Sequence, residues 1–238
     1  MKYNFQIKYN LQHDIWNWID SLTNPFMGLD WINNIDNKKD LRIAKQILKF
    51  KDNKKQAETI LKAYLEIQKN DPNSKLNKFI PLAQKDFENK YQQACKILEK
   101  ITQKPLLSDK FIFYVTTFPR CPYFYEKQEI FMYDSTHDFW GLPIDNFLHE
   151  GLHFQFTHYW YENKKSPVSK LNNIDFDYLK EALTIVLDDE LTPILSQPDQ
   201  GYSNQKKYRK TLHKHWQKHH DFDKLVNFGL SKLDNFKK

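Results

Sequence analysis

The chain of 238 residues contains only 5 glycines and 2 cysteines, and neither residue type forms a recognisable motif. The sequence has no GxGxxG and no GxxxxGK[ST] pattern, which argues against both familiar glycine-rich loops that bind nucleotide phosphates. The cysteines, Cys95 and Cys121, lack CxxC spacing and are too few for a disulfide framework. We therefore expect free buried thiols, and a disulfide stays open as an unsupported alternative.

Arginine is equally scarce, although the formal net charge is +6 and the sequence pI is about 9.0. The only arginines are Arg42, Arg120 and Arg209, so nearly all of the positive charge comes from lysine. Arginine is the residue that reads guanine and grips phosphate through a planar pair of donors. We therefore interpret the excess charge as a solvated lysine-rich surface and expect no specific nucleic-acid partner.

Long apolar runs are absent as well. The first residues, MKYNFQIKYNLQHD, lack the continuous apolar stretch of a secretion signal, and no segment approaches the ~18 apolar residues of a membrane helix. Hydrophobic residues nevertheless make up 40% of the chain and aromatic residues 16%, which is enough for a substantial core. We expect a folded, soluble, cytoplasmic protein that does not contact a membrane.

The spacing of the apolar residues predicts that residues 1–105 are helical, with clear helical stripes at 38–51, 55–69 and 76–103. The period then changes, and β-branched and aromatic residues predict two short strands at 111–117 and 128–133. Four more helices are expected, at 143–161, from Asp175 or Asp177 to about 190, at 203–220 and at 222–235.

These elements predict a mainly helical α+β fold with a small mixed sheet. We expect an N-terminal helical region at 1–105 and a compact core at 106–238. The two regions could also form one continuous domain, since the length suits a single large domain.

The segment 147–156, FLHEGLHFQF, contains the pattern H-E-x-x-H. His149 and His153 are four residues apart, so a helix places both imidazoles on one face, where they can bind one metal ion. Glu150 is rotated by about 100° along the helix, and from there its carboxylate can reach a water beside the metal without ligating. Zinc favours such imidazole ligands, and a general base is what a zinc-activated water needs.

This segment resembles the zinc helix of the gluzincin superfamily of metallopeptidases, and the resemblance covers roughly residues 110–195. It implies a zincin-like core, one Zn²⁺ ion and hydrolysis of peptide bonds in a peptide or protein substrate. It also implies a third ligand, a glutamate on the following helix, for which Glu181 in LKEALTIVLDDE is the best position. Asp188, Asp189 and Glu190 are the alternatives for this ligand.

The sequence departs from related patterns at several points. Phe156 and Tyr159 stand where metzincins need a glycine and a third histidine, and the G-x-M-E-N motif of gluzincin aminopeptidases is absent. Many gluzincins hold a carboxylate four residues after the third ligand to orient a histidine, but that position is Ile185 here. Thr184 or Asp188 is the expected substitute.

Two further features suggest chemistry beyond these ligands. The candidates for a group that stabilises an oxyanion are Tyr202, Tyr208, His213 and His215. The segment HKHWQKHH at 213–220 also places His215 and His219 four residues apart, as in a second metal site. We prefer to interpret this segment as a solvated basic helix, because lysines are interleaved with the histidines.

The preferred function is a zinc peptidase in which His149, His153 and Glu181 hold the ion. Glu150 takes a proton from the attacking water and passes it to the leaving amine. Three alternatives stay open: a zinc hydrolase that acts on another bond, a catalytically silent metal-binding module, and a basic interaction module in which the H-E-x-x-H pattern is accidental.

Overall fold

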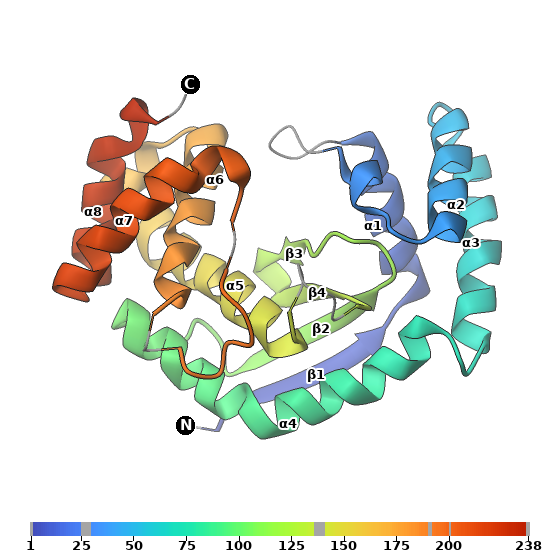
Figure 1. Cartoon of the computed structure of the whole chain (residues 1–238), viewed down its shortest axis with the longest axis horizontal. Helices are drawn as coiled ribbons and strands as arrows, with labels where there is room; N and C mark the ends of the chain where they lie inside the picture. The colour runs from blue at the N-terminus through green and yellow to red at the C-terminus, as the bar shows by residue number, and fades with distance from the viewer. Residues whose placement is uncertain (1, 25–29, 136–140, 190–191, 200, 237–238) are drawn as a thin grey trace. The chain divides into compact units, whose positions relative to one another are not determined.

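The structure is a computed structural model, and it describes residues 2–24, 30–135, 141–189, 192–199 and 201–236. Over these residues the fold is mainly helical with one small mixed sheet, which confirms the predicted α+β class (Figure 1). Among them, no helix has both the length and the apolar character needed to cross a bilayer.

The chain divides into two compact units, and each is assembled from separate segments of sequence. Unit 1 contains residues 1–3, 86–109 and 141–238, and unit 2 contains residues 4–85 and 110–140. Each unit therefore takes residues from both sides of position 105, where the sequence had suggested a boundary.

Helix α4, Lys75–Thr102, contributes residues to both units and matches the helix predicted at 76–103. Ala94, Leu98 and Ile101 in its second half are fully buried. Cys95 is buried beside them, and it forms no disulfide with Cys121, as the sequence predicted. Cys121 is only partly buried, which differs from the prediction of two buried thiols.

Unit 2 contains the sheet, whose strands are ordered β1-β2-β4-β3. Strands β2 (Lys110–Thr116) and β4 (Glu129–Tyr133) are the two predicted strands, and they pair in parallel. The short β3 (Tyr123–Phe124) pairs antiparallel with β4, so the sheet is mixed.

Strand β1, Asn4–Tyr9, corrects the prediction that the whole N-terminal region is helical. Its sequence NFQIKY alternates polar and apolar residues, which is the period of a strand. It pairs in parallel with β2, and Phe5 lies opposite Phe111. The strand partner is about a hundred residues further along the chain, so local spacing alone gave no reason to expect this pairing.

In addition to the first part of α4, the described residues of unit 2 contain the helices α1 (Leu11–Thr23), α2 (Lys38–Lys49) and α3 (Lys54–Asn70). An asparagine caps the N-terminus of each by accepting hydrogen bonds from backbone N–H groups, and these asparagines are Asn10, Asn37 and Asn53. The three helices pack on one another, and α1 also contacts β2. Their apolar faces form one core with fully buried side chains such as Trp18, Leu61, Leu65 and Phe118.

Unit 1 contains the helices that carry the motif residues. Helix α5 runs from Pro143 to Phe156 and continues as a π-helical turn, Thr157–Tyr161, so the predicted helix at 143–161 is confirmed. Helix α6 (Asn173–Leu183) follows and ends in a 3₁₀ turn, Thr184–Leu187. Its cap is Asn172, whose side chain accepts from the backbone N–H of Asp175, and not Asp175 or Asp177 as we expected.

The last two helices are α7 (Lys206–His219) and α8 (Phe222–Lys232), close to their predicted bounds. Helix α7 packs on α6, on α8 and on the 3₁₀ turn that ends α6. The core between them includes Leu179, Tyr208, Leu212 and Trp216. This packing fixes α6 beside α5 and so determines which side chains of the two helices meet.

Candidate metal centre

The N-terminus of helix α5 is held by two carboxylates. Asp145 accepts hydrogen bonds from the backbone N–H of Leu142, at 2.8 Å, and of Ser196, at 3.0 Å. Asp86 accepts from the backbone N–H of Ile144 at 3.0 Å. The bonds from Leu142 and Ile144 satisfy N–H groups that a helix start leaves without partners, and negative charge is favourable at this positive end of the helix. The helix that carries the H-E-x-x-H pattern is therefore fixed at its beginning.

Gly151, inside the pattern, lies where α5 meets α4. A Cβ atom at this position would lie 2.6 Å from Cδ1 of Leu98 and 3.3 Å from the ring of Phe147. Only a residue without a side chain fits there without movement of Leu98. This close approach explains why the helix contains a residue that disfavours helix formation.

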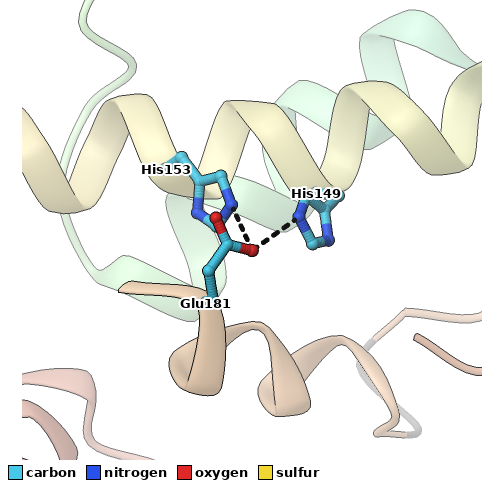
Figure 2. A group of neighbouring side chains, drawn as sticks. All are labelled: His149, His153 and Glu181. Atoms are coloured by element: carbon cyan, nitrogen blue, oxygen red, sulfur yellow. Dashed lines mark ion pairs between the residues drawn. The ribbon is translucent and has the colours of Figure 1, made fainter. Parts of the chain in front are cut away.

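His149 and His153 point from one face of α5 toward Glu181 on α6, as Figure 2 shows. The centroids of the two imidazole rings are 4.5 Å apart. One ligand atom from each of the three residues lies within 4.8 Å of the others, and among the described residues this is the only such group. The fold thus brings together the two histidines and the glutamate that the sequence singled out as metal ligands.

The distances between the donor atoms of His149, His153 and Glu181 indicate which ion the group can bind. Oε2 of Glu181 lies 3.4 Å from Nε2 of His149 and 3.3 Å from Nε2 of His153. Hydrogen bonds between N–H and O are shorter, about 2.9–3.0 Å. Zinc binds imidazole nitrogen and carboxylate oxygen at about 2.0–2.2 Å, which places neighbouring ligand atoms of a tetrahedron about 3.3–3.6 Å apart. The Glu181 oxygen therefore lies as far from each imidazole nitrogen as neighbouring corners of a tetrahedral zinc site lie from each other.

Glu150 is buried, with 7% of its surface exposed, and its carboxylate makes no hydrogen bond within the described part of the chain. Burial, followed by the negative charges of Glu181 and Asp199, raises its pKa to about 7 against the opposing charges of His149 and Lys180. A carboxylate with a pKa near neutrality is suited to take up and return a proton at physiological pH.

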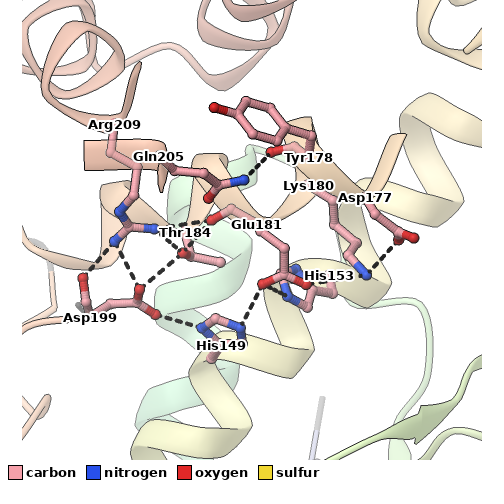
Figure 3. A network of polar contacts seen from close by, with 10 residues as sticks. All are labelled: His149, His153, Asp177, Tyr178, Lys180, Glu181, Thr184, Asp199, Gln205 and Arg209. Atoms are coloured by element: carbon pink, nitrogen blue, oxygen red, sulfur yellow. Dashed lines mark hydrogen bonds and ion pairs between the residues drawn. The ribbon is translucent and has the colours of Figure 1, made fainter. Parts of the chain in front are cut away.

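Asp199 supports His149 from the side opposite the ligand position. Its Oδ2 lies 2.5 Å from Nδ1 of His149, while Nε2 of the same ring faces Glu181 (Figure 3). Asp199 is in turn contacted through Oδ1 by the hydroxyl of Thr184 at 3.0 Å and by Arg209 at 2.8 Å. A carboxylate in this place keeps a proton on Nδ1, so Nε2 is the nitrogen that would give up its proton to bind a metal.

This arrangement differs from the one we expected. Thr184 and Asp188 were the predicted substitutes for the orienting carboxylate, but neither contacts a histidine ligand through a hydrogen bond in the described residues. Both act on Asp199 instead: Thr184 through its hydroxyl, and Asp188 by accepting from the Asp199 backbone N–H at 2.6 Å. Asp199 lies in the segment between α6 and α7, where no helical period links it to the motif.

Arg209, on α7, forms hydrogen bonds both to the end of α6 and to Asp199. Its Nη1 donates to the backbone carbonyl of Glu181 at 3.0 Å and to the Thr184 hydroxyl at 2.6 Å. Its Nη2 donates to the backbone carbonyl of Asp199 at 2.5 Å and to the Asp199 carboxylate at 2.8 Å. The side chain is almost fully buried, so these four bonds fix the position of the Asp199 carboxylate relative to the last turn of α6.

The charges of the buried residues balance one another. Burial opposes a charge on His149, but Asp199 and then Glu181 outweigh burial and raise its pKa well above the usual value. Burial would also raise the pKa of Glu181, yet its contacts with His153, Lys180 and His149 hold it well below the usual range. Burial lowers the pKa of His153 to about 4, which leaves a neutral imidazole, the form that binds metals.

The alternative third ligands lie elsewhere. Asp189 accepts a hydrogen bond from the Trp216 indole at 2.9 Å and pairs with His220 at 3.4 Å. Asp188 accepts from the Asp199 backbone, and neither carboxylate belongs to the group around His149. Glu190 lies outside the described residues.

The four candidates for oxyanion stabilisation have different surroundings. Tyr208 is fully buried and donates to the Gly229 carbonyl, and His215 stacks on the ring of Phe228 at 4.1 Å, so both have structural roles. His213 lies near Asp188, whose pKa is raised by burial against the opposing charge of His213. Tyr202 is the candidate within electrostatic reach of the site residues, because burial and then the charges of Glu181, Glu150 and Asp199 raise the pKa of its hydroxyl strongly.

No protein-family model, no curated protein and no solved structure matches this chain. The interpretation of the site therefore depends on its residues and their geometry.

Proposed function

We propose that this protein is a zinc-dependent hydrolase that cleaves peptide bonds, with His149, His153 and Glu181 as the zinc ligands and Glu150 as the general base. The observation that carries the proposal is the spacing of 3.3 and 3.4 Å between Oε2 of Glu181 and the two Nε2 atoms. This spacing suits a tetrahedral zinc site with its fourth position open for water or substrate, which is the pattern of catalytic and not of structural zinc sites.

Zinc bound by these residues would polarise the carbonyl group of a substrate and lower the pKa of a water molecule toward ~7. Glu150 is one residue from His149 on α5, and its buried carboxylate has no hydrogen-bond partner among the described residues to hold it away from that water. Its pKa of about 7 lets it accept the proton as the water attacks and then donate it to the departing amine.

Tyr202 supplies the second polar group of the proposed reaction. Because burial and three nearby carboxylates keep its hydroxyl protonated, it can donate a hydrogen bond to the carbonyl oxygen as negative charge develops there. The assignment to peptide substrates, and to a zincin-like core, rests on the resemblance of the His149–His153 segment to gluzincins. The main alternative is a metal-binding module without catalysis, and it differs in needing no role for Glu150.

The first experiment compares the metal content of the purified protein with that of His153→Ala. We expect about one zinc per wild-type chain and loss of the zinc in the variant, because two remaining ligands hold zinc weakly. An absence of zinc in the wild type, even after reconstitution, would show that the motif is accidental.

The second experiment separates catalysis from metal binding. Glu150→Gln should retain zinc and lose turnover of a peptide library, because the amide cannot accept the proton. Glu162→Gln is the matched control, since Glu162 is an exposed carboxylate that pairs with His158 on the π-helical turn. Turnover in Glu150→Gln equal to that of the control would refute the role of Glu150, whereas zinc binding without turnover in the wild type would favour the silent module.

A further inference from the structure

The two carboxylate oxygens of Glu181 face different partners. Oε2 faces the ring nitrogens of His149 and His153, whereas Oε1 lies 3.4 Å from Nζ of Lys180 (Figure 3). The same ammonium group lies 3.1 Å from Oδ1 of Asp177, one turn earlier on α6. One oxygen of Glu181 therefore faces the proposed metal ligands, and the other faces the ammonium group of Lys180.

Lys180 is unusual for a lysine because only 5% of its side chain is exposed. A buried ammonium is costly unless carboxylates compensate it, and here Glu181 and Asp177 both do so. The ammonium group of Lys180 lies between these two carboxylates, and the centre of the Phe176 ring is 5.7 Å from Nζ. The lysine thus occupies a defined place and does not extend into solvent.

This arrangement bears on how many oxygens of Glu181 can bind a metal. Carboxylates ligate metals through one oxygen or through both, and binding through both would use the coordination position that a water or substrate needs. An ammonium whose charge holds Oε1 leaves only Oε2 for the metal. The effect depends on the position of the positive charge, not on packing alone.

We propose that Lys180 is a positioning residue that restricts Glu181 to one-oxygen coordination and thereby keeps a coordination position of the metal open. The inference rests on the metal site proposed above. A purely structural role for Lys180, as a counter-charge that lets α6 fold, makes a different prediction: its removal would change stability but not the coordination of the metal.

The experiment uses Co²⁺ in place of zinc, because the visible absorption of Co²⁺ weakens as its coordination number rises from four to five. Wild type should take up one Co²⁺ with the intense spectrum of four-coordination. Lys180→Met should bind Co²⁺ with the weaker spectrum of a higher coordination number, since Oε1 is released to the metal. Lys180→Arg, which retains the charge and the donors, should restore the wild-type spectrum.

The exposed Lys164 provides the matched control, and Lys164→Met should give the wild-type spectrum. With zinc bound, Lys180→Met should lose turnover roughly tenfold or more, a loss larger than that in zinc affinity. Circular dichroism identifies a variant that fails to fold, and Lys180→Gln, uncharged and shorter, then takes the place of Lys180→Met.

The possible results separate a failure of the role of Lys180 from a failure of the proposed metal site. An unchanged Co²⁺ spectrum in the folded, uncharged variant would overturn the role of Lys180 and leave the metal site intact. A wild-type protein that binds no Co²⁺ or Zn²⁺ would overturn the metal site and the inference together. A weakened spectrum that Lys180→Arg fails to restore would also contradict the charge-based role.

Discussion

Nδ1 of His149 and Oδ2 of Asp199 are 2.5 Å apart, and this contact joins the proposed metal-binding face of α5 to the segment before α7. The carboxylate is buried and is itself held by Arg209 and Thr184. Burial would raise the pKa of Asp199, but the charges of His149 and Arg209 hold it far below the usual range. Asp199 is therefore a permanent anion, fixed where it orients the first histidine.

Asp199→Asn should weaken zinc binding by roughly 10- to 100-fold, because the neutral amide orients His149 less strongly and makes its Nε2 a poorer donor. Competition with a chromophoric chelator measures this change. Asp189→Asn is the matched control, since Asp189 accepts from Trp216 in the same part of unit 1 but does not contact a proposed ligand. An unchanged zinc affinity in Asp199→Asn would contradict the role of the contact.

Arg209→Met should lower the free energy of unfolding by roughly 3–5 kcal/mol, because it leaves the buried carboxylate of Asp199 without its cation. Arg209→Lys should recover only part of the loss, since one ammonium cannot make four bonds in the directions of a guanidinium. Urea unfolding measures both variants. Exposed Arg42→Met is the control, and a loss no larger than in that control would refute the prediction.

Gly151→Ala should destabilise the protein, although alanine favours helix formation by about 1 kcal/mol. The added methyl group would overlap Cδ1 of Leu98, and such overpacking costs about 1–3 kcal/mol. Combined with Leu98→Ala, the substitution should cost much less than it does alone, because the space is then vacant. A thermal-unfolding cycle over the four proteins tests this coupling, and additive effects would show that the two positions do not meet.

Asp134, at the end of β4, should make the stability depend on pH. Burial, followed by the charges of Asp14 and Asp40, raises its pKa to about 8, although Lys75 opposes the shift. Because the folded state holds this proton more tightly than the unfolded state, stability is highest below about pH 4 for this group and falls as pH rises toward 8. The loss is roughly 1.4 kcal/mol for each pH unit in that range.

Asp134→Asn should therefore be more stable than wild type at pH 8 and show a shallower decline in stability between pH 5 and pH 8. Chemical denaturation at both pH values gives the two slopes. Asp109→Asn, at an exposed position, should follow the wild-type profile. A slope in Asp134→Asn equal to that of wild type would mean that another group titrates.

The elements in which apolar residues recur at a clear helical spacing were predictable from the sequence. Helices α2, α3 and α4 carry apolar stripes that no proline-rich or glycine-rich segment interrupts, and their observed bounds lie within a residue or two of the predicted ones. The position of His149 and His153 on one face of a helix could be predicted from the same helical geometry. Glu181 followed from a resemblance, and the structure brings it to the two rings.

The features that the sequence did not reveal depend on contacts between distant segments. Strand β1 needed its partner β2, and Asp199 needed the path of the chain after α6, which no local pattern specifies. Lys180 resembled any other charged residue of an amphipathic helix. Its burial became apparent only when Asp177 and Glu181 were seen on both sides of its ammonium group.

The parallel pairing of β1 with β2 has a consequence for biosynthesis. Asn4 pairs with Lys110, so the first strand leaves the ribosome about a hundred residues before its partner. At a synthesis rate of about 5–20 residues per second, β1 spends roughly 5 to 20 s without a strand to pair with. An unpaired strand edge is prone to aggregation during that interval, and the sheet can form only after all of α1 to α4 has been made.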